Sequence, residues 1–200
     1  MSKVVIAGDA SGTGTFTISA PNGNTDRTLV LPDEAGTIIT TAGVPASAMP
    51  AGSVIQVVSA TLTSAQTIAS QTFTDITGLS VSITPTSASS KIFVLIKVSA
   101  GHQAYGHSYI RMLRDSTLIA AGSDASLVQC FSSVAIQEDW ATHDHVMFHL
   151  DSPSTTSSVT YKAQGRREYT SGALYINRSA RNTGLDQSTA SNITVMEIAS

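Results

Sequence analysis

The segment Ser90–Ala100, SKIFVLIKVSA, is the most continuously apolar stretch of the chain and decides its fold class. It is rich in β-branched residues and follows Ser-rich turn residues, a combination that favours a strand over a helix. Side chains alternate between the two faces of a strand. One face then consists of Ile92, Val94, Ile96 and Val98. Phe93 and Leu95 lie on the other face, which is therefore half apolar as well.

The second face of this strand needs a cover. A strand in an ordinary two-sheet sandwich requires apolar side chains only on its inner face. The chain has few helical candidates, since no stretch shows the charged wet face of a long amphipathic helix. We therefore expect another copy of the same chain to bury Phe93 and Leu95, which predicts an assembly of β-sandwiches.

Composition excludes several classes of protein. The chain of 200 residues has 42% hydrophobic but only 12% charged residues, about half the usual charged share. Its net charge of −3 argues against a dedicated nucleic-acid binder. The single cysteine, Cys130, excludes an internal disulfide framework and an all-cysteine metal site. The apolar run in MSKVVIAGD is too short for a signal peptide or a membrane span, so we expect synthesis in the cytoplasm and no membrane insertion.

The chain divides at Gly43–Gly52, GVPASAMPAG, which combines two prolines with small, uncharged residues. Ten of the eleven aromatic residues follow Gly52, so the preceding part lacks the bulk for a globular core of its own. Its alternation of apolar residues and Thr (TFTI, TLVL, TIIT) favours an elongated β structure with a core shared between chains over a disordered segment. We therefore predict a β stem at residues 1–48 and a β-sandwich head at residues 49–200.

The head is predicted to be all-β. Short strands bounded by turn residues follow one another without a helical period, which indicates an antiparallel β-sandwich or jelly roll. The predicted strands are Val54–Ala60, Gln71–Ile76, Leu79–Thr84, Lys91–Ala100, Ser108–Arg114, Thr117–Ala120, Leu127–Gln137, His145–Asp151, Ser158–Gln164, Ala173–Ile176 and Ile193–Ile198. Arg114, Asp115 and Ser116 are expected to form the turn of a hairpin.

Two regions resemble known phage proteins. Residues 11–43, SGTGTFTISAPNGNTDRTLVLPDEAGTIITTAG, resemble the glycine-spaced module near the start of many bacteriophage tail-fibre and virion-fibre proteins. That module has a TFTI-type strand, an Asn/Asp-Arg-Thr-Leu strand, a Leu-Pro-Asp turn and then Gly-Thr-Ile. Four later stretches, Gly52–Ala60, Phe73–Pro85, Ser89–Ala100 and Tyr109–Leu118, resemble the head domain that often follows it, whereas the loops after Gly122 show no such resemblance.

The resemblance implies an intertwined homotrimeric fibre on a phage virion, with a C-terminal jelly-roll head of the complement/tumour-necrosis-factor type. It agrees with the two inferences from the residues, because a rotational trimer would bury both the N-terminal strands and Phe93 with Leu95 around an axis. Residues 1–48 would then contact other virion proteins of the tail, baseplate or capsid. Fibres of this kind attach a phage to the host surface, or decorate its capsid without a receptor role.

The segment HDHVMFH at residues 143–149 is a candidate metal site. A regular strand places His143, His145 and His149 on one side, and two imidazoles at i and i+2 can chelate one cation. Around a three-fold axis, three pairs would supply six nitrogen ligands, a set that suits iron or nickel. Some phage fibres hold an axial metal through a His-x-His pair, so the resemblance supports His143 and His145. The alternative is half-exposed histidines bonded to Asp144 or Asp151; no other cofactor is expected.

Two segments are candidates for receptor or glycan binding. Tyr105 lies in the loop GHQAYGH, where an aromatic ring could stack on a sugar face; the alternative is a hairpin loop packed on its own tyrosine. The segment 165–181, GRREYTSGALYINRSAR, could bind an anionic host surface. Its candidate residues are Arg166, Arg167, Tyr169, Tyr175, Arg178 and Arg181. Alternatively, these arginines pair with the acidic stretch Asp115–Asp151 of their own or a neighbouring subunit.

No catalytic set is present in the sequence. The chain has no Gly-x-Ser-x-Gly elbow, and Glu138 and Asp139 are adjacent, so on a strand they would point to opposite faces. We therefore expect a binding protein rather than an enzyme. A cellular jelly-roll lectin, with a saturable sugar site and no virion partner, is the alternative from another class.

Overall fold

The computed structural model describes residues 11–14, 23, 46–103, 106–136, 138–168 and 172–200. The chain divides into two units, Met1–Ile39 and Thr40–Ser200. Most of the predicted stem, with the strands expected in it, lies outside the described residues. The described strands all belong to the second unit, which contains the head predicted at residues 49–200.

The described residues of the second unit form strands and a single 3-10 turn, η1 (Ala46–Ala48). The strands are β1 (Val54–Leu62), β2 (Gln66–Ile68), β3 (Thr74–Ile83), β4 (Lys91–His102), β5 (Gly106–Arg114), β6 (Thr117–Ile119), β7 (Ser132–Ile136), β8 (His143–Asp151), β9 (Val159–Arg167), β10 (Leu174–Ile176) and β11 (Ser191–Ile198). All their pairings are antiparallel, which confirms the predicted fold class.

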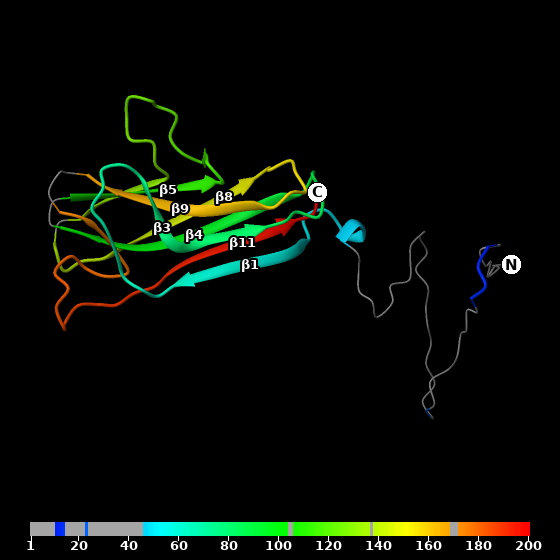
Figure 1. Ribbon diagram of the computed structural model, residues 1–200, viewed down its shortest axis with the longest axis horizontal. Coiled ribbons are helices and arrows are strands. Elements are labelled where there is room, and N and C mark those ends of the chain that lie inside the picture. Colours follow the sequence, from blue (N-terminus) through cyan, green and yellow to red (C-terminus); the bar gives the residue numbers. More distant parts are fainter. Residues whose placement is uncertain (1–10, 15–22, 24–45, 104–105, 137, 169–171) are drawn as a thin grey trace. The chain divides into compact units, whose positions relative to one another are not determined.

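The strands form two sheets that pack as a sandwich (Figure 1). In the first sheet the longer strands lie in the order β1-β11-β4-β8, and in the second the order is β3-β9-β5-β7. The short strands β2, β6 and β10 extend these sheets. If the eight longer strands are renumbered from 1 to 8 in chain order, the first sheet has the order 1-8-3-6 and the second has the order 2-7-4-5. Each sheet therefore alternates early and late strands, which is the arrangement of a jelly roll.

Strand β4 forms the centre of the core, as its sequence predicts. Ile92, Val94, Ile96 and Val98 are all 0% exposed. Phe93 and Leu95 point to the opposite side and are half-buried. The period-2 alternation of this one segment therefore assigns its inner and outer faces correctly.

Most predicted strands differ from the structure by one to three residues at their ends, and three differences are larger. The two strands predicted at Gln71–Ile76 and Leu79–Thr84 are one strand, β3, with an irregular register where Gly78 adopts a φ of 84°. The short strand β2 was not predicted, because its three residues carry no pattern of their own. Within the described part of the predicted strand Leu127–Gln137, β7 is limited to Ser132–Ile136; before it, the N–H of Phe131 still donates to the carbonyl of Ile110 in β5 (3.0 Å).

The expected hairpin between β5 and β6 is confirmed. Arg114 pairs with Thr117, so Asp115 and Ser116 form a two-residue loop. Asp115 adopts a φ of 52°, a conformation that Asp tolerates better than most residues, and its carboxylate accepts a hydrogen bond from the backbone N–H of Thr160 (2.9 Å).

The two ends of the sandwich carry different parts of the chain. At one end, which we call the proximal end, β1 begins beside the C-terminus, where the N–H of Gly52 donates to the carbonyl of Ala199 (2.8 Å) (Figure 1). At the opposite, distal end, Leu62 pairs with Ser191, and Ala100 pairs with His143. The loops that precede β8 and β11 therefore lie at the distal end, away from the point where the chain enters the head.

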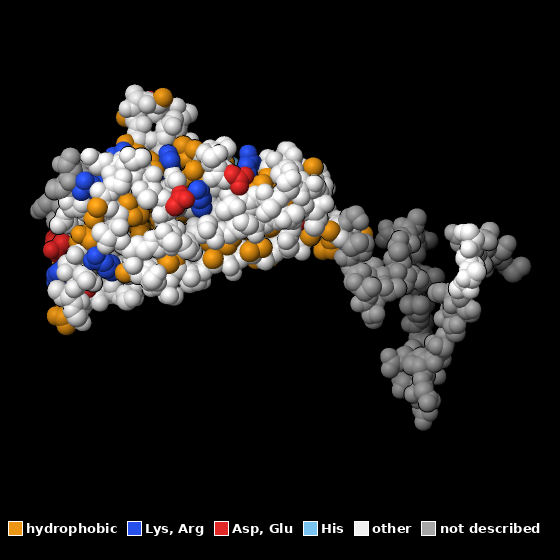
Figure 2. Space-filling model, in the orientation of Figure 1, with side chains coloured by type: hydrophobic (Ala, Val, Ile, Leu, Met, Phe, Trp, Pro, Cys, Tyr) orange, Lys and Arg blue, Asp and Glu red, His pale blue; other side chains and the backbone are white. Residues whose placement is uncertain are grey.

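The visible face of the head is largely uncharged, with Lys, Arg, Asp and Glu side chains confined to a few small groups (Figure 2). This agrees with the low charged fraction of the sequence, 12%. Among the residues that the structure describes, no helix has the length and apolar character needed to cross a membrane.

Candidate binding surfaces and site

The outer side of the first sheet carries a continuous apolar surface. On β8, Val146, Phe148 and Leu150 are 54%, 61% and 54% exposed. Leu150 lies opposite Phe93 of β4, and Phe148 lies opposite Leu95. The surface continues through Met196 of β11, which pairs with Phe93, to Val57 of β1. We call this set the outer apolar face; it consists of Val57, Phe93, Leu95, Val146, Phe148, Leu150 and Met196.

This arrangement extends the prediction made from β4 alone. The sequence identifies Phe93 and Leu95 as the apolar outer residues, and the register adds partners from three neighbouring strands. Large apolar patches that remain exposed on a single chain are typical of interaction surfaces. Towards the distal end the surface becomes polar, where Lys97 and Asp144 form an ion pair (3.1 Å).

The histidines of β8 do not form the expected metal site. His143, His145 and His149 do share one side of the strand, opposite to Val146, Phe148 and Leu150. On that side His145 is buried in the sandwich and His149 is half-buried, whereas His143, at the distal end of the strand, is exposed. His145 is 1% exposed, and its two ring nitrogens share hydrogen bonds with Ser108 Oγ (2.7 Å) and Ser132 Oγ (2.8 Å). Both potential ligand atoms of His145 are therefore occupied within the chain.

The surroundings of His145 also change its acidity. Burial lowers the pKa of His145 to about 4, because the charged imidazolium would lose its hydration inside the core. The nearby His143 lowers this pKa further, and Asp144 opposes the shift. Among the described residues, no group of three His, Cys, Asp or Glu side chains is arranged to hold a metal ion. The imidazole of His145 thus has a structural role as a neutral, hydrogen-bonded core residue.

The basic residues of segment 165–181 make separate contacts within the head. The guanidinium of Arg166 lies over the ring of Tyr109 at 5.1 Å, and Arg167 Nη1 donates to the carbonyl of Gly172 (2.7 Å). Arg178 stacks on Tyr175 at 4.1 Å. Cation–π contacts of this kind hold a guanidinium in place without neutralising it.

Arg181 pairs with Asp186, not with the acidic stretch before β9. The hydrogen bond from Arg181 holds the pKa of Asp186 well below its usual range, together with the N–H of Thr183 (2.7 Å). Binding of an anionic surface by Arg166, Arg167 and Arg178 stays a prediction. Tyr105 and Tyr169, the two remaining candidates, lie outside the described residues.

Two buried carboxylates are satisfied inside the head. Asp151 accepts hydrogen bonds from the hydroxyl of Tyr161 (2.7 Å) and from Arg114 Nη1 (2.8 Å). Glu197 accepts from Gln56 Nε2 (2.6 Å) and from both the N–H and the hydroxyl of Thr86 (2.7 Å each). Burial raises the pKa of Glu197, but the hydrogen bonds outweigh it and leave the pKa below its usual value. These groups therefore stabilise the fold.

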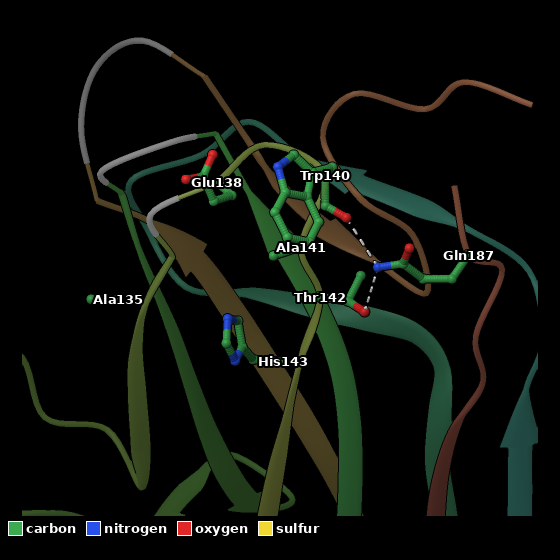
Figure 3. Close-up of a pocket in the computed structure, with 7 residues that line it drawn as sticks. All are labelled: Ala135, Glu138, Trp140, Ala141, Thr142, His143 and Gln187. Atoms are coloured by element: carbon green, nitrogen blue, oxygen red, sulfur yellow. Dashed lines mark hydrogen bonds between the residues drawn. The ribbon is translucent and has the colours of Figure 1, made fainter. Parts of the chain in front are cut away.

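An open depression of about 530 Å³ lies at the distal end, in front of β7 and β8. Its wall contains Trp140, the only tryptophan of the chain, whose side chain is 51% exposed. The residues that line it are Ala135, Glu138, Trp140, Ala141, Thr142, His143 and Gln187 (Figure 3). This site was not predicted from the sequence, although an isolated tryptophan in a polar loop is an available signal.

Gln187 joins the two loops that form this depression. Its amide Nε2 donates to the carbonyl of Trp140 (3.1 Å) and to Thr142 Oγ1 (3.0 Å), as the dashed lines in Figure 3 mark. The loop before β8 is also bound from the other side, where the N–H of Arg181 donates to the carbonyl of Asp139 (2.9 Å). The segments 138–142 and 181–187 therefore support each other.

Comparisons of the sequence with protein-family models and with curated proteins find no match. The class that the structure itself defines is an antiparallel jelly-roll head with an outer apolar face and a distal depression.

Proposed function

We propose that this chain is the subunit of a homotrimeric phage fibre, in which residues 1–48 join the virion and the head binds the host surface. The observation that carries the proposal is the outer apolar face, which spans four neighbouring strands and includes three β8 side chains that are more than half exposed. The resemblance of the sequence to phage fibre proteins supports the same assembly.

Burial against another copy of the chain accounts for the outer apolar face better than permanent exposure to solvent does. Burying a large apolar side chain stabilises a structure by about 1.5–3 kcal/mol, and roughly half of that gain is still available to Phe148, Leu150 and Val146. In a closed ring, each copy would bury the same residues, so the gain repeats in every subunit. A second copy of the same chain is also present wherever the chain is made, whereas another partner must be supplied.

The two ends of the head fit an attachment role. The chain enters the head at the proximal end, beside Ala199. The distal end carries the longest described loop, the one between β10 and β11 (Figure 1). Loops on a rigid sandwich are the usual place for binding residues. A head held at its proximal end would therefore present its distal loops to a host cell.

The first test is the native mass of the purified chain, measured by light scattering. We expect three times the chain mass of 20.8 kDa. Phe148→Asp should reduce this to the mass of a single chain, because it would place a carboxylate in the apolar contact. Leu127→Asp is the matched control: Leu127 is 69% exposed but lies in the loop before β7, away from the outer apolar face. A monomeric wild-type chain, or a trimeric Phe148→Asp variant, would contradict the assembly.

The second test separates host attachment from capsid decoration. The labelled trimer should bind intact host cells in a saturable manner, and antibodies against the head should mark the tail of the particle. Labelling of the capsid without cell binding would favour the decoration role. A protein that binds cells in the absence of any particle component would favour the lectin alternative.

A further inference from the structure

We propose that the distal depression around Trp140 is the subsite that binds the host ligand, and that this ligand is a neutral pyranose ring of a surface glycan. The inference names the ligand class for the attachment role proposed above, and in that sense it rests on that proposal. The glycan subsite and the trimer contact depend on different parts of the molecule, so an experiment can disprove one of them without the other.

Trp140 provides the platform for a sugar ring. Its indole is 51% exposed and stands at the wall of an open depression of about 530 Å³. A depression of this size is within the range of small-molecule sites. The C–H face of a pyranose is apolar, and it packs on the face of an aromatic ring while its hydroxyls stay at the edge.

Polar groups surround the platform. Both amide hydrogens of Gln187 are used within the chain, but its Oε1 accepts no hydrogen bond from the residues that the structure describes. Thr142 Oγ1 accepts from Gln187 and keeps its own hydrogen to donate. The carboxylate of Glu138 and the imidazole of His143 lie at the other side of Trp140 (Figure 3). Donors and acceptors are therefore both present, which is what sugar hydroxyls require.

The charge of the depression selects a neutral ligand. Its lining residues include Glu138 but no Lys or Arg. Arg181, on the adjoining loop, is engaged by Asp186. A phosphate or a carboxylated sugar would meet the Glu138 carboxylate without a compensating cation, whereas a neutral ring would not. The arginines of segment 165–181, for which an anionic surface was predicted, are therefore not among the residues that line the depression.

The site is held in place before any ligand arrives. Gln187 fixes the backbone of Trp140, and the ion pair between Arg181 and Asp186 fixes the loop that carries Gln187. A loop that is already ordered loses less conformational entropy on binding. The depression also lies on the side of β8 that bears His143, opposite to the outer apolar face, so a trimer formed through that face would leave it accessible.

The test uses the intrinsic fluorescence of the full chain. Because Trp140 is the only tryptophan, selective excitation reports on this site alone. The probes are the methyl glycosides of glucose, galactose, mannose and N-acetylglucosamine, with glucose 6-phosphate and N-acetylneuraminic acid as anionic comparators. We expect at least one neutral glycoside to change the emission in a saturable way, and the anionic sugars to bind at least about tenfold more weakly.

Variants then assign the response to the depression, with binding measured by calorimetry. Trp140→Ala should weaken binding at least tenfold, because truncating an aromatic anchor typically removes that much affinity. Trp140→Phe should keep part of the affinity, and Leu127→Ala, on a different loop, should bind like the wild type. No saturable response to the four neutral glycosides, a preference for the anionic sugars, or unchanged binding by Trp140→Ala would each overturn the proposal. The native mass of the same samples reports separately on the trimer.

Discussion

Acidification should destabilise the head through His145. The imidazole is 1% exposed and bonded to Ser108 and Ser132, and burial lowers its pKa to about 4 from the usual 6.5. In the unfolded chain the same group titrates near 6.5. Between these two values the unfolded state binds more protons than the folded state, so stability falls as the pH falls. Above about pH 6.5 both states are neutral at His145 and the penalty vanishes.

The size of this effect follows from the two pKa values. One unit of pKa difference corresponds to about 1.4 kcal/mol. At pH 5 the unfolded imidazole is almost fully protonated and the folded one is largely neutral, which lowers the free energy of unfolding by about 2 kcal/mol relative to pH 8. Carboxylates with lowered pKa values, such as Asp75 and Glu197, contribute a loss of the same sign only below about pH 4.5. The window from pH 7 to pH 5 therefore isolates the histidine.

The assay is denaturant unfolding at fixed protein concentration between pH 8 and pH 5, for the wild type and for His145→Gln. The variant loses hydrogen bonds and is expected to be less stable at pH 8, so the informative quantity is the change with pH within each protein. That change should be smaller by about 2 kcal/mol in His145→Gln. An equal loss of stability between pH 8 and pH 5 in the two proteins would refute the argument, because a group other than His145 would then supply the pH dependence.

Three further substitutions test the packing of the head by thermal and denaturant unfolding. Tyr161→Phe removes the hydroxyl that donates to Asp151 (2.7 Å) and should lower the free energy of unfolding by about 2 kcal/mol without changing the shape of the core. A Tm equal to that of the wild type would contradict this role of the hydroxyl. Ile96→Ala creates a cavity at a residue that is 0% exposed and should lower the free energy of unfolding by about 2–5 kcal/mol. A loss of stability below about 1 kcal/mol would show that the core relaxes into the cavity. Gly101→Ala would place a Cβ 2.5 Å from a backbone carbonyl oxygen and should lower the free energy of unfolding by about 1–3 kcal/mol. Gly122→Ala is the control, because a Cβ there would have no atom within 4 Å, and its stability should be close to that of the wild type. Similar losses of stability in the two variants would rule out this steric explanation.

Much of the fold could be predicted from local sequence pattern. The inner and outer faces of β4 follow from the alternation of its side chains, which depends only on neighbouring residues. The hairpin at Asp115 follows in the same way from turn residues between two apolar runs. Pattern was less informative where the chain itself is irregular, as at Gly78, because a bulge within a strand resembles a break between two strands.

The sites depended on contacts that the sequence alone does not reveal. The alternation placed His143, His145 and His149 on one side of β8, but only the packing of that strand shows that this side faces Ser108 and Ser132 instead of a neighbouring chain.

The depression around Trp140 likewise needs Gln187, which is 47 residues further along the chain. The amino-acid sequence by itself thus determined most of the strands, their alternation and the apolar outer side of β4, since these follow from each residue and its near neighbours. Only the tertiary structure decided which side of β8 is buried and which distant loops meet at the distal end, because register and sheet packing set those contacts.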